Sequence, residues 1–219
     1  PPRWTLEPTN TAAVLGTDVL LNCKANGFPK PQIIWKRAEG SLTSDYKTLL
    51  TDAHIHMMSN GSLSVRHVEK SDSGYYMCQA SNGIGSGIST VVKLTVRVPA
   101  YFKEEFKAET IRKGENIRIK CQAFGDRPLS VTWRKDSQVL DRQLNRKYMV
   151  EDTLTDDGMT SELNIPSADR RDSSLFTCTA ANTYGKDDLN IQIIVLPGGP
   201  PLNIRAEAVS SQTLRVFWQ

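Results

Sequence analysis

The feature that most constrains this 219-residue chain is one spacing of cysteine and tryptophan, which occurs twice. In each half a cysteine is followed 12 residues later by a tryptophan and more than fifty residues later by a second cysteine: Cys23, Trp35 and Cys78, then Cys121, Trp133 and Cys178. Four cysteines at long, similar spacings indicate structural disulfides and an oxidising compartment. The alternative is four reduced, buried cysteines.

The strings that follow the second cysteines also match. Cys78–Gly85 reads CQASNGIG and Cys178–Gly185 reads CTAANTYG. The repeat covers nearly 100 residues each time, which is the size of a domain rather than of a solenoid unit. We therefore predict one domain over residues 1–97 and a second over residues 98–196.

Each half alternates between apolar and polar residues with the period of a half-buried strand. Inward-facing residues are predicted at Val19, Leu21, Cys23, Ile33, Trp35, Leu63, Val65, Tyr76, Cys78, Val92, Leu94 and Val96, and at Ile117, Ile119, Cys121, Val131, Trp133, Leu163, Ile165, Phe176, Cys178, Leu189, Ile191 and Ile193. Turn residues separate these runs, and no segment has a convincing helical period. The pattern predicts an all-β chain of two tandem β-sandwiches.

The paired cysteines fit this architecture. Two antiparallel sheets pack about 10 Å apart, so inward-facing cysteines on strands of facing sheets can bridge them, with the tryptophan packed against the bridge. We predict the pairs Cys23–Cys78 and Cys121–Cys178, because pairing across the domains would destroy both cores. Each bridge closes a loop of over fifty residues, worth about 4 kcal/mol.

The segment Asp72–Cys78, of the form Asp-x-Gly-x-Tyr-x-Cys, resembles the sixth strand of immunoglobulin domains. Together with the Cys-x-Ala-x-Asn-x-x-Gly strings, it makes both domains similar to the intermediate (I-set) domains of adhesion receptors. The resemblance implies that Tyr76 is the corner tyrosine, whose hydroxyl bonds to nearby backbone. The second domain has Phe176 at this position, so we expect the bond to be missing there.

Residues 197–219 have a different pattern. Pro200–Ile204 followed by Leu214–Trp218 resembles the first two strands of a fibronectin type III domain, with Trp218 as its core tryptophan. Twenty-three residues are too few to fold alone. We interpret this tail as the truncated start of a third domain.

The chain as a whole resembles the Down syndrome cell adhesion molecule (Dscam) family. The similar segments are Pro1–Pro8, Gly27–Pro31 and Ser81–Gly87, together with the order of two immunoglobulin domains and then fibronectin. The resemblance implies an extracellular part of a single-pass plasma membrane protein, with homophilic recognition of the same protein on an apposed cell and neurite self-avoidance. In the long receptors of that family recognition lies mostly in more N-terminal domains, so this pair is expected to act as a semi-rigid spacer.

The short linker agrees with a spacer. Val96–Ala100 leaves almost no residues between the predicted domains, and a linker of two or three residues does not behave as a flexible coil. Pro99 also fixes its own φ and favours extended geometry at Val98. We predict two domains end to end with limited bending, which solution scattering would test.

Two further motifs have both a functional and a structural interpretation. Asn60-Gly61-Ser62 is the one N-glycosylation sequon, and Asn-Gly also makes tight turns before a strand. His54 and His56 could place two imidazoles on one face of a strand, but a metal site needs further ligands nearby and none is evident. We expect a turn that is also a candidate glycan site at Asn60, and no metal.

Composition excludes several classes of function. The net charge is +3, without the basic excess that attracts nucleic acid. No apolar run is long enough to span a membrane and the chain opens without a signal peptide, so a signal and an anchor are expected elsewhere in the protein. We expect no enzyme, cofactor or small-molecule substrate. The alternatives are a growth-factor-type receptor ectodomain and an intracellular muscle-type scaffold, whose reducing compartment would not need paired cysteines.

Overall fold

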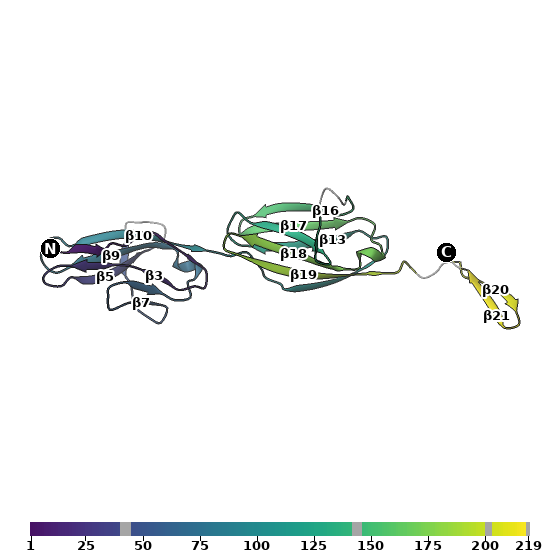
Figure 1. Ribbon diagram of the computed structural model, residues 1–219, viewed down its shortest axis with the longest axis horizontal. Helices are drawn as coiled ribbons and strands as arrows, with labels where there is room; N and C mark the ends of the chain where they lie inside the picture. Colours follow the sequence, from purple (N-terminus) through teal and green to yellow (C-terminus); the bar gives the residue numbers. More distant parts are fainter. Residues whose placement is uncertain (40–44, 142–145, 200–202, 218–219) are drawn as a thin grey trace. The chain divides into compact units, whose positions relative to one another are not determined.

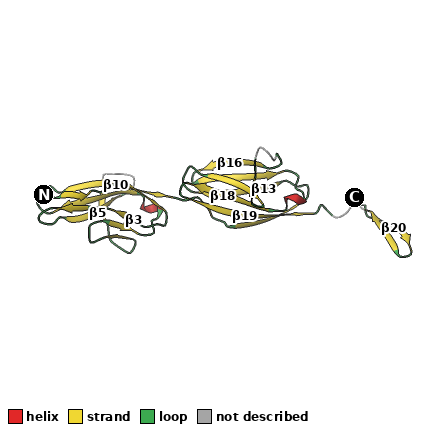
Figure 2. Ribbon diagram, viewed as in Figure 1, coloured by secondary structure: helices red, strands yellow, loops and turns green. Residues whose placement is uncertain are grey.

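The structure is a computed structural model that describes residues 1–39, 45–141, 146–199 and 203–217. Over these ranges the regular structure is strand, apart from two short 3₁₀ turns, η1 (Lys70–Asp72) and η2 (Arg170–Asp172), shown in Figure 2. Pro1–Pro99 form most of one compact unit, and Ala100–Asn182 with Lys186–Gln219 form the other. The all-β prediction is confirmed.

The first unit is a sandwich of strands β1 to β10 (Figure 1). Their bounds are β1 Arg3–Leu6, β2 Thr11–Val14, β3 Val19–Leu21, β4 Lys24–Asn26, β5 Gln32–Ala38, β6 Tyr46–Thr48, β7 Ile55–Met57, β8 Leu63–Val65, β9 Gly74–Ser81 and β10 Ile88–Arg97. One layer is the five-stranded sheet β2-β10-β9-β5-β6, in which β2 runs parallel to β10. The other layer is divided into β3-β8-β7 and the pair β1-β4, because the strand that carries Cys23 is interrupted at that residue.

The second unit repeats the plan with strands β11 to β19. Their bounds are β11 Tyr101–Phe102, β12 Phe106–Arg112, β13 Ile117–Phe124, β14 Ser130–Lys135, β15 Gln138–Val139, β16 Met149–Thr155, β17 Gly158–Ile165, β18 Leu175–Asn182 and β19 Gly185–Leu196. Here the cysteine-bearing strand β13 is continuous, so one layer is a single sheet, β11-β13-β17-β16. The facing layer is the sheet β12-β19-β18-β14-β15, in which β12 runs parallel to β19 as β2 does to β10 in the first unit.

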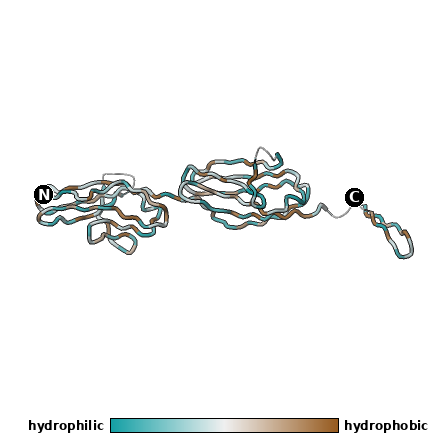
Figure 3. Tube along the Cα trace, in the orientation of Figure 1, coloured by the Kyte–Doolittle hydropathy of each residue, from teal (hydrophilic) through white to brown (hydrophobic). Residues whose placement is uncertain are grey.

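The alternation along the strands places the cores where the sequence predicts them. In the colouring of Figure 3, hydrophobic and hydrophilic residues succeed one another along the strands of both sandwiches. The inward-facing residues of β13, β17, β18 and β19 are almost completely buried, while those of β3 and β5 include the half-buried Val19 and Ile33. Register pairs Trp35 with Cys78 and Trp133 with Cys178 on neighbouring strands. Each tryptophan therefore lies beside its disulfide.

The tail contains a hairpin of β20 (Arg205–Ser210) and β21 (Thr213–Phe217), whose residues are all exposed. β21 overlaps the second strand of the fibronectin interpretation, Leu214–Trp218, whereas β20 begins after the segment proposed for the first strand, Pro200–Ile204. Residues 200–202 and 218–219, which include Pro200 and Trp218, lie outside the described residues. The fibronectin interpretation therefore remains a prediction.

Candidate functional site

The two cystine cores are the most distinctive chemical feature of the chain. The structure joins Cys23 to Cys78 and Cys121 to Cys178, with a Cα–Cα distance of 6.6 Å in both cases. All four cysteines are fully buried, and none is left as a free thiol. Each bridge ties the two sheets of one sandwich together, which is the pairing expected from the sequence.

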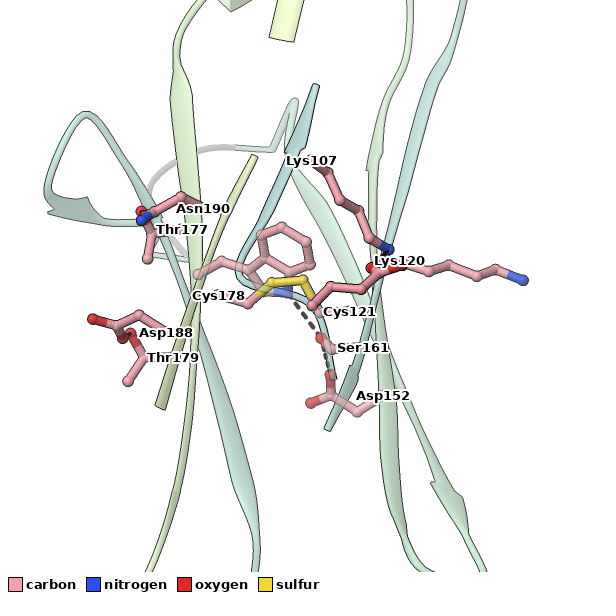
Figure 4. The surroundings of a disulfide bond; sticks show 12 residues. Lys107, Lys120, Cys121, Asp152, Ser161, Thr177, Cys178, Thr179, Asp188 and Asn190 are labelled. Carbon is pink, nitrogen blue, oxygen red and sulfur yellow. Dashed lines mark hydrogen bonds and ion pairs between the residues drawn. A yellow bond between two sulfur atoms is a disulfide. The ribbon is translucent and has the colours of Figure 1, made fainter. Parts of the chain in front are cut away.

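The indole N–H of each core tryptophan has a different kind of partner in the two domains. Trp35 Nε1 donates to the backbone carbonyl of Gly61 at 2.8 Å. Trp133 Nε1 donates to the side-chain Oγ of Ser161 at 2.8 Å, and Ser161 Oγ donates in turn to Asp152 Oδ1 at 2.5 Å (Figure 4). Strand register places Ser161 directly opposite Cys121. The second domain therefore stabilises its tryptophan through a side-chain relay that no sequence motif indicated.

Removing the relay hydroxyl tests its contribution. Ser161→Ala should lower the free energy of unfolding of the second domain by about 1–3 kcal/mol, because a buried indole N–H would lose its acceptor. The measurement is a denaturant melt followed by tryptophan fluorescence. Ser161→Thr keeps the hydroxyl and is the control for side-chain size. A Ser161→Ala domain as stable as the original would mean that the indole finds another acceptor.

The corner tyrosine of the first domain makes the bond that its position implies. Tyr76 is fully buried, and its hydroxyl donates to the backbone carbonyl of Asp72 at 2.7 Å. Burial raises the pKa of Tyr76 to about 12, so the hydroxyl stays protonated and able to donate. The bond fixes η1 to the start of β9.

We predict that Tyr76→Phe lowers the stability of the first domain by about 1 kcal/mol, the usual net value of one hydrogen bond. The measurement is the denaturant midpoint of that domain. The second domain, which already has Phe176 here, is the internal reference and should be unchanged. Equal midpoints for Tyr76→Phe and the original chain would contradict a stabilising role for this hydroxyl.

In the second domain a different tyrosine supplies a hydroxyl to the same region. Phe176 cannot bond there, as expected, but Tyr148, next to the start of β16, packs edge-on against Phe176 with ring centroids 6.2 Å apart. Its hydroxyl donates to the side-chain Oδ1 of Asp172 at 3.0 Å. Burial, followed by this bond to a carboxylate, raises the pKa of Tyr148. The hydroxyl that Phe176 lacks is thus replaced by that of Tyr148 in the same region.

A buried aspartate occupies the same place in both domains. Asp72 and Asp172 each end a 3₁₀ turn and accept from backbone N–H groups of that turn, at Glu69 and Asp169 respectively. Both carboxylates are almost fully buried. A buried carboxylate requires a partner, because desolvation of an unpaired charge is costly.

The partner differs between the domains. In the first, His54 Nε2 lies 3.0 Å from both carboxylate oxygens of Asp72. In the second, Lys147 Nζ donates to Asp172 Oδ2 at 2.6 Å and to Asp169 Oδ2 at 3.0 Å. Burial lowers the pKa of Lys147, but these bonds outweigh it and raise the pKa overall, while the bond from Lys147 lowers the pKa of Asp169. The hydrogen bond to Asp72 raises the pKa of His54 above its ordinary value, against a smaller effect of burial.

The first domain should therefore become more stable in mild acid. The pKa of His54 is higher in the folded chain than in the unfolded one, where it is about 6.5. The resulting stabilisation is complete below that value and is lost as pH rises through the folded pKa. Besides Asp72, Glu69 also raises the pKa of His54, and Asp52 is the other charged group beside it.

Denaturant midpoints at about pH 6 and pH 8.5 measure this effect. The midpoint of the first domain should be higher at the lower pH, and His54→Gln should remove the His54 contribution. The second domain should not show this loss of stability between the two pH values, because Lys147 stays charged at both. An equal pH dependence in the His54→Gln variant would assign the effect to other groups.

These contacts also concern the two histidines considered as metal ligands. His54 precedes β7 and is bonded to Asp72, while His56 lies within β7. Of the two histidines, therefore, only His56 lies within a strand. Over the described ranges, no group of three or more His, Cys, Asp and Glu side chains is placed to hold a metal ion.

The candidate glycan site lies at a tight turn between β7 and β8. Asn60 is exposed, and its Oδ1 accepts a bond from Ser62 N at 2.9 Å. Gly61 has φ of +94°, and an added Cβ would lie 2.7 Å from the carbonyl oxygen of Cys23. The turn interpretation and the glycan interpretation of this motif are therefore compatible.

Surface hollows of the second domain include one of about 380 Å³ and one of about 780 Å³. The smaller is lined by Lys103, Lys107 and Lys120 beside Phe102 and Phe124. Lys107 is paired with Glu104, and Lys120 with Glu162.

Comparison with known proteins agrees with this architecture. The immunoglobulin domain family matches residues 1–82, and the immunoglobulin I-set domain family matches residues 100–195. The cell adhesion molecule Dscam1 of Drosophila melanogaster is 41% identical over 195 residues, which cover 89% of this chain and 10% of that protein. The chain belongs to the immunoglobulin superfamily and is homologous to the Dscam family.

Other Dscam relatives match as well. Dscam2 of Drosophila melanogaster is 35% identical over 221 residues, and DSCAM of Homo sapiens is 33% identical over 218; both alignments cover 100% of this chain and 11% of the relative. The chain thus spans about a tenth of the length of the curated relatives it matches. The resemblance stated from the sequence is confirmed, apart from the fibronectin segment.

Solved structures show the same fold. The insect immune protein hemolin has a TM-score of 0.68 at 19% identity, covering 89% of this chain and 47% of that one. The N-terminal four domains of Dscam1 isoform 9.44 give 0.60 at 21%, covering 89% and 45%. The I67–I69 fragment of titin gives 0.62 at 23%, covering 90% and 66%. Because an adhesion receptor and a muscle protein match about equally well, these structures establish the fold and not the function.

Proposed function

We propose that this chain is an extracellular stretch of a cell-surface adhesion receptor, and that it takes part in binding rather than catalysis. The observation that carries the proposal is the homology to Dscam cell adhesion molecules along 89–100% of the chain. Two buried disulfides support an oxidising, extracellular compartment and argue against a cytosolic muscle-type scaffold. No helix among the described residues is long and apolar enough to cross a membrane.

The partner we propose for the whole receptor is the same protein on an apposed cell. Within it, residues 1–196 act as a spacer. The outward face of β18 and β19 carries polar side chains that bond to one another within the sheet: Thr177 with Asn190 at 2.9 Å, and Thr179 with Asp188 at 2.6 Å (Figure 4).

A cell-aggregation assay with the full-length receptor tests both parts. Cells that express the receptor should aggregate with one another and not with cells that lack it. Replacing residues 1–196 by two unrelated disulfide-bonded immunoglobulin domains should preserve aggregation if the segment is a spacer. Loss of aggregation on replacement would show that these domains contact the partner. Failure of the original receptor to aggregate, with binding to a foreign soluble ligand, would favour the growth-factor-type alternative.

A further inference from the structure

The turn that contains Asn60 exposes the asparagine of the sequon to solvent and buries the serine hydroxyl. Asn60 is exposed at the turn between β7 and β8. Ser62, whose hydroxyl completes the sequon, has no exposed surface. Its Oγ accepts a bond from Cys23 N at 3.4 Å and donates to Asn22 Oδ1 at 3.5 Å. The acceptor amide therefore faces solvent while the hydroxyl is enclosed beside the disulfide.

The rest of the turn is held just as firmly. The carbonyl of Gly61 accepts the indole N–H of Trp35, and the α-carbon of Gly61 approaches the carbonyl of Cys23 and the side chain of Ile33 too closely for a Cβ. Opening this turn would separate β8 from the cystine core. Such openings belong to the large, sub-global fluctuations of a domain rather than to the fraying of a loop.

We propose that Asn60 is N-glycosylated, and that the sugar is added before the core of the first domain closes around Ser62. The transfer forms a bond between Nδ2 of Asn60 and the anomeric carbon of an oligosaccharide carried on a lipid diphosphate. The bond from that carbon to the diphosphate oxygen breaks, Nδ2 loses one proton, and the lipid diphosphate leaves. The amide oxygen is not consumed, so the bond from Ser62 N to Asn60 Oδ1 persists in the glycosylated domain.

The inference rests on the secretory route contained in the proposed function, so its test has one arm in cells and one with purified components. In secretory cells, the peptide that contains Asn60 should carry an oligosaccharide that a glycan-cleaving amidase removes, leaving aspartate. Asn60→Gln and Ser62→Ala should lose it, and Ser62→Thr should keep it. Asn82 is the matched negative control, because Asn82-Gly83-Ile84 has the same Asn-Gly pair and the same Oδ1 bond, to Ile84 N at 3.0 Å, but no hydroxyl.

The second arm tests the order of events without reference to location. The unglycosylated 219-residue chain is incubated with an oligosaccharyltransferase and a lipid-linked oligosaccharide, once folded with both disulfides formed and once reduced and unfolded. Transfer to Asn60 should be more than about tenfold slower for the folded chain. Equal rates would overturn the proposed order, and no transfer to either form would overturn the site. An unmodified Asn60 in cells combined with transfer to the reduced chain would instead reject the secretory location.

Discussion

Replacing Cys23 and Cys78 together by alanine should lower the free energy of unfolding of the first domain by about 4 kcal/mol, because the bridge closes a loop of 55 residues in the unfolded chain. The matched variant is Cys121→Ala with Cys178→Ala, whose loop of 57 residues gives nearly the same expected loss in the second domain. Denaturant midpoints of each domain, measured without reductant, give both values. In each variant the domain that keeps its bridge is the internal reference.

Treatment of the original chain with a reductant is the control for cavity effects of the alanines. It removes both bridges while leaving the side chains in place, so it should reproduce most of the loss. A loss below about 1 kcal/mol in either double variant would contradict the chain-entropy argument. Loss of both domains on removal of one bridge would mean that the two sandwiches unfold as one unit.

The next largest effect should come from Asp172→Ala, which we expect to destabilise the second domain by about 3 kcal/mol. The carboxylate has no exposed surface and accepts bonds from Lys147, Tyr148 and Asp169 N. Its removal leaves a buried phenol hydroxyl and a backbone N–H without that acceptor, and separates a cation from its partner. Chemical denaturation of the variant, compared with the original chain at pH 7, measures the loss.

Two comparisons make this prediction specific. Asp172→Asn keeps an acceptor for Tyr148 and loses the charge. The free energy of unfolding of this variant should therefore lie between that of Asp172→Ala and that of the original chain. Asp72→Ala in the first domain leaves His54, which becomes neutral at higher pH, so its cost should be smaller at about pH 8.5 than at pH 6. The same pH dependence in both aspartate variants would contradict the assignment of histidine and lysine as their partners.

The strand period and the cysteine–tryptophan spacing were sufficient to predict most of both cores, because alternation depends on positions along a single strand, and the spacing marks inward-facing cysteines of facing sheets. Ile119, Leu163 and Phe176, for example, are buried as the alternation predicts. The interruption of the first domain's sheet at Cys23 was not predicted, since the continuous strand β13 has the same alternation in its sequence.

The contacts that differ between the domains were also missed. Tyr148 contacts Phe176 and Asp172 from the residue before β16, a strand of the opposite sheet, and the sequence separation gives no indication of that contact. The one available signal was an aromatic residue beside Lys147 at the start of an alternating segment. Likewise, Ser161 accepts the bond from its tryptophan because strand register places it opposite Cys121, and Gly61 does so from the turn before β8.

The difference between Gly61 and Ser161 as indole acceptors predicts that the two domains tolerate substitutions differently at these positions. In the first domain the acceptor for the indole is a peptide carbonyl, which survives any change of side chain, but position 61 itself admits only glycine because of its positive φ and close neighbours. In the second, position 161 has ordinary extended geometry but is fully buried beside the cystine core, so a replacement must be small as well as able to accept the bond. In a library of all substitutions, we expect almost no residue other than glycine to be tolerated at position 61, and tolerance at position 161 to follow the size and hydrogen-bonding capacity of the side chain.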